Sequence, residues 1–86
     1  MIERIESLIV ETEKFYASNL DPMTLVILKE LNRLLMLFKS GESDQHILHR
    51  AAYGLATVVM DDYRFSESPL GHKLMVLSND IIKENK

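Results

Sequence analysis

The run from Met23 to Phe38 constrains this chain most, because eleven of its sixteen residues are large and apolar. On a helix with 100° per residue, six of them fall within one arc of about 120°, which is a normal stripe facing a core. These six are Ile27, Leu28, Leu31, Leu34, Leu35 and Phe38. Four more lie on the other side of the helix: Leu25, Val26, Met36 and Leu37. A helix of this kind needs neighbours on two sides, so we expect the rest of a small bundle, or another chain, to cover the second face.

Composition restricts the chain to a single globular domain, residues 1–86. Its hydrophobic fraction of 47% and charged fraction of 27% are those of an ordinary folded protein. Three glycines, two prolines, no tryptophan and long segments of helical period favour an all-α fold. The chain has no cysteine, so it can form neither a disulfide nor a thiolate zinc site. This absence fits a reducing cytoplasm, which is the location that we expect.

Neither the first residues of the chain nor its apolar run predicts a membrane role. The first residues, MIERIESLIVETEK, are acidic and amphipathic rather than basic and then apolar, so we expect no secretory signal. The Met23–Phe38 run contains charged residues and is too short to cross a bilayer.

The formal net charge of −3 comes from ten basic and thirteen acidic residues. Proteins that bind duplex nucleic acid usually carry a basic stripe, so this balance argues against DNA or RNA as a partner. It is compatible with a basic protein partner.

The periodicity and the capping signals predict four helices. Asp21 followed by Pro22 is a typical N-cap and first helical residue, and Ser68 followed by Pro69 repeats this device. Gly41 is placed to end a helix in the left-handed conformation, and Ser43 or Asp44 caps the next one. The expected ranges are about 2–18, 22–39, 44–62 and 69–84, followed by fraying at Asn85 and Lys86.

Short connections between helices of similar length predict an antiparallel up-down-up-down four-helix bundle. Small residues along the third helix should let a neighbouring helix approach closely: Ala51, Ala52, Gly54 and Ala56. Gly71 lies in the first turn of the last helix and is expected to admit a close neighbour.

No motif in the chain predicts catalysis, a cofactor or a metal site. His46 and His49 are three residues apart on one helix face, but a metal site needs at least one more ligand, and none falls at a recognised spacing. The serines lack a nucleophile-elbow motif. We therefore expect a protein that is not an enzyme.

A better candidate is the outer face of the third helix, where Arg50 and Tyr53 lie opposite the aliphatic stripe. Tyrosine and arginine are enriched where one protein binds another. The alternative is that these side chains only cover an edge of the bundle.

The densest acidic cluster lies on or beside the last connector, where Asp61, Asp62 and Glu67 surround Tyr63. Acidic groups around an aromatic side chain can attract and hold a basic partner. In the alternative interpretation the cluster is a solvated loop and Phe65 packs into the core.

Self-association is a second hypothesis, since a core of this size is marginal and dimerisation would bury more apolar surface. The residues that would form the contact are Val26, Met36 and Leu37. They belong in part to a mixed seam along the back of the second helix, formed by Val26, Glu30, Arg33 and Leu37.

In size, charge and helix content, and in the segment DDYRFSESPLG at residues 61–71, the chain resembles the small helical immunity proteins with which bacteria neutralise their own toxins. The resemblance implies a cytoplasmic inhibitor that binds a cognate toxin, often a nuclease with a basic cleft. Asp61, Asp62, Tyr63 and Glu67 would then contact the toxin, supported by Arg50 and Tyr53. The rival interpretation is a homodimeric helical adaptor or structural protein.

Overall fold

The computed structural model describes residues 1–84, and the fraying expected for Asn85 and Lys86 lies outside this range. These residues form an all-α fold, as the sequence predicts. The helices are α1 (Ile2–Asn19), α2 (Pro22–Lys39), α3 (Gln45–Asp61), α4 (Tyr63–Ser66) and α5 (Pro69–Glu84). The four long helices match the predicted ranges to within one residue at each end.

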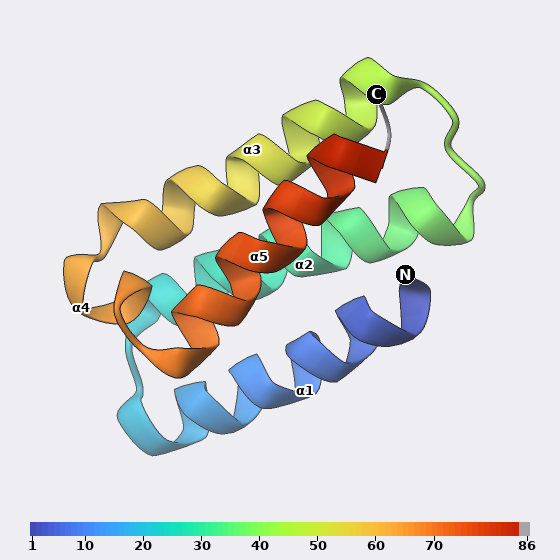
Figure 1. Ribbon diagram of the computed structural model, residues 1–86. Coiled ribbons are helices and arrows are strands. Elements are labelled where there is room, and N and C mark those ends of the chain that lie inside the picture. The colour runs from blue at the N-terminus through green and yellow to red at the C-terminus, as the bar shows by residue number, and fades with distance from the viewer. Residues whose placement is uncertain (85–86) are drawn as a thin grey trace.

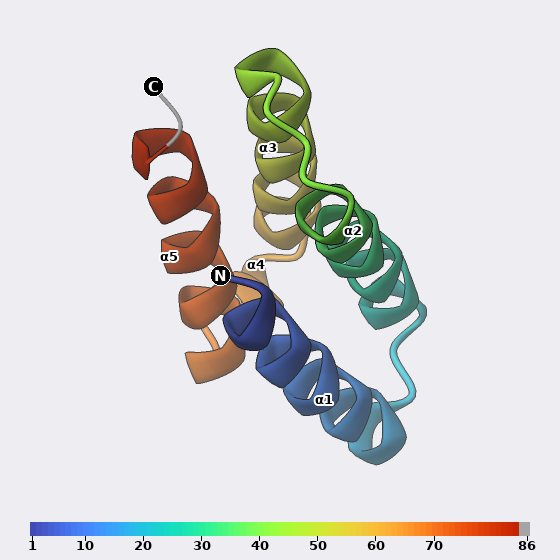
Figure 2. The same cartoon turned by 90° about the vertical axis from the view of Figure 1, so that its right-hand side faces the viewer.

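Each long helix runs opposite to the long helix before it (Figure 1), and the fold measures 35 × 21 × 17 Å. α2 packs against α1 on one side and α3 on the other. Of its second apolar face only Leu37 packs against the core, whereas Leu25, Val26 and Met36 remain exposed, so within the described residues the expected cover for this face is largely missing. α5 packs mainly on α3, whereas α1 and α5 touch over a small area only (Figure 2).

Local signals place the helix ends. The backbone N–H of Met23 donates to Asp21 Oδ1 (3.0 Å), so Asp21 caps α2 ahead of Pro22. Asp44, rather than Ser43, caps α3. Gly41 follows α2 with φ of +73°, as its predicted role as a left-handed cap requires.

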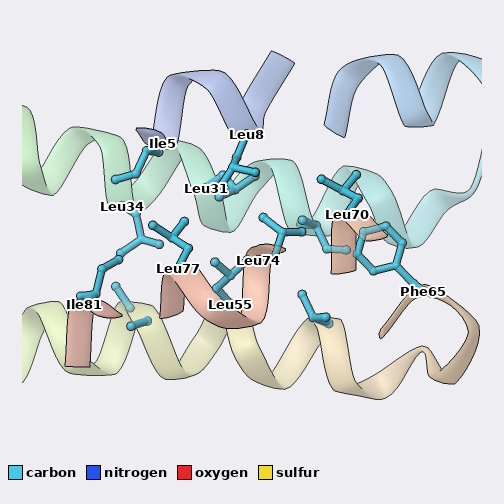
Figure 3. Close-up of a cluster of buried hydrophobic side chains, with 14 residues drawn as sticks. Ile5, Leu8, Leu31, Leu34, Leu55, Phe65, Leu70, Leu74, Leu77 and Ile81 are labelled. Carbon is cyan, nitrogen blue, oxygen red and sulfur yellow. The ribbon is translucent and has the colours of Figure 1, made fainter. Parts of the chain in front are cut away.

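The core is a continuous aliphatic layer between the long helices (Figure 3). Its fully buried side chains come from all four: Ile5, Ile27, Leu31, Leu34, Leu55, Val59, Leu74, Leu77 and Ile81. Small residues bring α3 and α5 together as predicted, because Ala51 and Ala52 are buried and the Ser78 hydroxyl donates to the Ala52 carbonyl oxygen (2.7 Å).

The prediction of four helices was wrong in one respect, since the connector after α3 contains the one-turn helix α4. Asp62 caps α4 by accepting a hydrogen bond from the Phe65 N–H (3.1 Å). Phe65 is buried and meets the Phe15 ring edge-on, with 5.2 Å between centroids. A four-residue helix has no periodicity to recognise, and this ring contact with α1 cannot be read from the neighbouring residues.

The return from α4 to α5 is tight. The Ser68 hydroxyl caps α5 by accepting a hydrogen bond from the Gly71 N–H (3.0 Å). A Cβ atom at Gly71 would overlap the Phe65 carbonyl oxygen and lie 2.9 Å from its carbonyl carbon. The expectation that Gly71 admits a close neighbour is therefore confirmed, and that neighbour is the backbone of α4.

Candidate functional site

Three large exposed side chains lie between the middle of α3 and the start of α4. Tyr53 is 58% exposed, Met60 60% and Tyr63 72%. Tyr53 and Met60 are seven residues apart, which places them on the same side of α3 about 10 Å from each other. With the acidic residues Asp61 and Glu67 they form what we name the α3–α4 surface.

The acidic residues of this region divide into two kinds. Asp61 and Glu67 are exposed and take part in no ion pair among residues 1–84. Asp62 is half-buried and caps α4, so its carboxylate already has a structural partner. Of the two aromatic residues in the connector, Tyr63 faces solvent and Phe65 belongs to the core, as the alternative interpretation of the sequence expected.

Arg50 lies apart from this acidic cluster, although the sequence analysis grouped them. Eleven residues of helix separate Arg50 from Asp61, which is about 16 Å along α3. Arg50 instead lines a shallow hollow of about 170 Å³ between α2 and α3, together with Arg33, His46 and Ile47. Tyr53 lies between the two regions, one turn from Arg50.

The residues proposed for self-association differ in exposure. Met36 is 72% exposed and Val26 43% exposed, so both offer apolar surface on α2. Leu37 is half-buried and packs against the core. α3 covers part of the mixed seam, because a Cβ atom at Gly54 would lie 3.3 Å from the Glu30 Oε2 atom.

A further hollow of about 340 Å³ lies between α1 and α5, and no sequence pattern indicated it. Two ion pairs link the helices there: Arg4 with Asp80 (2.7 Å) and Glu11 with Lys73 (2.8 Å). The paired residues are 76 and 62 positions apart in the chain, so only the tertiary fold brings them together. Because each cation already has a carboxylate partner, the walls offer little free charge to a ligand.

His46 and His49 lie on α3, the first exposed and the second half-buried. The described part of the chain contains no group of three or more histidine and acidic residues that could hold a metal ion. None of the helices within residues 1–84 has the length and apolarity needed to cross a membrane.

Comparison of the chain with protein-family models, with curated proteins and with solved structures gave no match. Interpretation of the exposed surfaces therefore depends on their own geometry and chemistry.

Proposed function

We propose that this protein is a non-enzymatic helical module that binds another protein through the α3–α4 surface. The observation that carries the proposal is the exposure of Tyr53, Met60 and Tyr63 beside Asp61 and Glu67. Tyrosine and methionine are enriched in protein interfaces, and an aromatic side chain set among charged groups is a typical binding anchor. In solution by itself, the protein leaves these apolar atoms in contact with water.

The partner that fits this surface is a basic protein. Asp61 and Glu67 form no ion pair within residues 1–84, not even with Arg64 three residues away, so their carboxylates are available to a partner's lysine or arginine. Such charges raise the rate of association and reject acidic competitors. The resemblance to immunity proteins gives the sharpest version: a bacterial cytoplasmic inhibitor that covers the basic surface of a toxin, for example a nuclease.

The architecture that we infer for this function is an antiparallel up-down-up-down four-helix bundle whose last connection carries α4. Such a bundle is a rigid support, and Tyr63 and Glu67 at the two ends of α4 are held to it by the buried Phe65 ring. Interface residues on a rigid support lose little conformational entropy on binding.

The test compares the protein with its Asp61→Lys/Glu67→Lys variant as bait for proteins of its own cell, with recovery measured by quantitative mass spectrometry. Asp62 is left unchanged because its loss would remove the α4 cap. The control is the Glu13→Lys/Glu84→Lys variant, which changes the net charge equally at exposed positions elsewhere. Circular dichroism verifies that all three proteins are folded.

We expect the protein and the control to recover one basic protein at equal stoichiometry, and the Asp61→Lys/Glu67→Lys variant to recover at least about tenfold less. If the recovered protein is a toxin, expressing it alone should arrest growth, and only the protein and the control should restore it. Equal recovery with the Asp61→Lys/Glu67→Lys variant would show that the α3–α4 surface is not the site. Recovery of the bait alone would reject the function.

Exposure of Val26 and Met36 supports a second candidate, a homodimer formed through α2. Met36→Glu is the appropriate substitution, because Met36 is exposed, whereas a charge at the half-buried Leu37 would also disturb the core. Sedimentation equilibrium should then give a dimer for the protein and a monomer for the Met36→Glu variant. A monomeric protein at all concentrations would eliminate this candidate.

A further inference from the structure

The outward face of α2 and α3 carries a concentration of positive charge that the overall charge of −3 conceals. Lys29, Arg33 and Arg50 are all exposed, and none of them forms an ion pair with any residue between 1 and 84. His46 lies beside Arg33 and Arg50 in the same hollow. The face therefore presents three unneutralised cations to solvent.

The carboxylate that lines a hollow together with two of these cations is partly withdrawn from solvent. Glu30 lines a hollow of about 660 Å³ on α2 with Lys29, Arg33 and Met36. Its Oε2 atom is buried against Gly54 of α3 and has no hydrogen-bond partner in the described chain. The negative charge is thus turned toward α3, while the positive charges remain outside.

Apolar side chains lie among these cations. Met36 lines the larger hollow and Ile47 the smaller one, and both are exposed. Arg33 lines both hollows, so they lie next to each other, the larger one along α2 and the smaller one where α3 packs on α2. We name this surface, formed by Lys29, Arg33, Met36, Ile47 and Arg50, the α2–α3 face.

We propose that the α2–α3 face is a second docking site, and that its occupant is an acidic amphipathic helix of a partner protein. A depression between two helices accepts the apolar stripe of a third helix. Glutamate or aspartate residues beside that stripe would pair with Lys29, Arg33 and Arg50. From Lys29 to Met36 the face extends about 10 Å along α2, which corresponds to about two turns of bound helix.

Charge argues against a second copy of this chain as the occupant, and therefore also against the homodimer through Met36 that was the second candidate above. A two-fold axis through the face would bring Lys29, Arg33 and Arg50 of one copy against the same residues of the other. Like charges in a desolvated contact are unfavourable, and the only carboxylate in the larger hollow is Glu30, which is turned inward.

Charge also argues against an anionic membrane. Recognition of acidic lipids usually requires about four to eight clustered lysines and arginines. The face has three, on a chain whose net charge of −3 would be repelled by the same lipids.

The test is a selection from a phage-displayed library of helical peptides about 16 residues long, which is enough for the two contacting turns and flanking residues. In these peptides, the positions on the solvent-facing side of the helix vary among Glu, Lys and Ser, and the positions of the apolar stripe vary among Leu, Met and Ala. Selected peptides are then titrated by fluorescence anisotropy against the protein and its Arg33→Glu, Arg50→Glu and Arg64→Glu variants. Arg64→Glu is the matched control, since Arg64 is exposed on α4 and has no ion pair in the described structure.

We expect the enriched peptides to be rich in glutamate. Arg33→Glu and Arg50→Glu should each weaken their binding by about tenfold or more, whereas Arg64→Glu should change it by less than about twofold. Added salt should weaken binding to the protein as well.

Other outcomes would overturn the proposal: no enrichment, enrichment of basic or uncharged peptides, or acidic peptides whose binding survives both Arg33→Glu and Arg50→Glu. If the protein co-sedimented with phosphatidylserine vesicles and Arg33→Glu abolished this binding, the occupant of the face would be a membrane surface rather than a helix. If the protein were a dimer and the Met36→Glu variant a monomer, the occupant of the face would be a second copy of this chain. The Arg33, Arg50 and Met36 substitutions leave the α3–α4 surface unchanged, so the two proposals succeed or fail separately.

Discussion

Replacing Gly71 by alanine should destabilise the fold, although alanine is the better helix former. The added Cβ atom would overlap the Phe65 carbonyl oxygen and lie 3.0 Å from the Ser66 Cα atom. The three nearest atoms all belong to the backbone, so no side-chain rotation relieves the overlap. α4 or α5 must move, and this movement loosens the buried ring of Phe65.

The expected magnitude is the difference between two terms. Overpacking a well-packed site costs about 1 to 3 kcal/mol, and an overlap with backbone belongs at the upper end. Exchanging glycine for alanine within a helix returns about 1 kcal/mol. We therefore expect a loss of about 2 kcal/mol in the free energy of unfolding, which for a domain of this size lowers the Tm by about 8 to 16 °C.

Gly54→Ala is the matched control, since Gly54 also lies within a long helix. Its Cβ atom would meet only the Glu30 carboxylate, at 3.3 Å, and that group is the end of a flexible side chain. We expect a free energy of unfolding between unchanged and about 1 kcal/mol higher. Urea and thermal unfolding followed by circular dichroism measure both variants. A Gly71→Ala variant as stable as the parent, or equal effects at the two glycines, would refute the reasoning.

Four further substitutions test the buried polar groups and a helix cap, each by urea unfolding. Ser78→Ala removes the buried hydrogen bond between α5 and the carbonyl of Ala52 and should cost about 1 kcal/mol; no loss would mean that this bond adds nothing. Thr24→Val removes a buried hydroxyl that has no partner within residues 1–84, so stability should stay equal or rise by about 1 kcal/mol. The Thr12 hydroxyl donates to a carbonyl one turn earlier, so Thr12→Val should instead be neutral to destabilising. A Thr12→Val variant more stable than the Thr24→Val variant would contradict the hydrogen-bond assignments. Asp44→Ala removes the cap of α3 and should cost about 1 kcal/mol, so an unchanged midpoint would show that the cap does not stabilise α3.

The surfaces were only partly predictable from the sequence. The outward position of Tyr53 follows from helical periodicity alone, because its place opposite the aliphatic stripe is a property of α3 itself. The roles of Asp62 and Phe65 do not follow from periodicity, because both depend on the formation of α4. The role of Phe65 depends in addition on a ring of α1 that is 50 residues away in the chain. The i, i+4 spacing of Lys29 and Arg33 was a visible signal of a basic face. No sequence signal indicated that Arg50 belongs to the same basic face, because α3 joins that face only through packing on α2.

By itself, the sequence determined the class of fold and the ends of the long helices. Caps such as Asp21 and Gly41 act on backbone groups within four residues of themselves, and the apolar stripes are set by the 3.6-residue period. These effects are local, so they can be read along the chain. Tertiary structure alone decided which groups meet across helices: the Phe65 ring against Phe15, the backbone of α4 against Gly71, and Arg33 beside Arg50. Such contacts depend on the angles and registers at which whole helices pack, and those are set by the summed burial of many side chains rather than by any one segment.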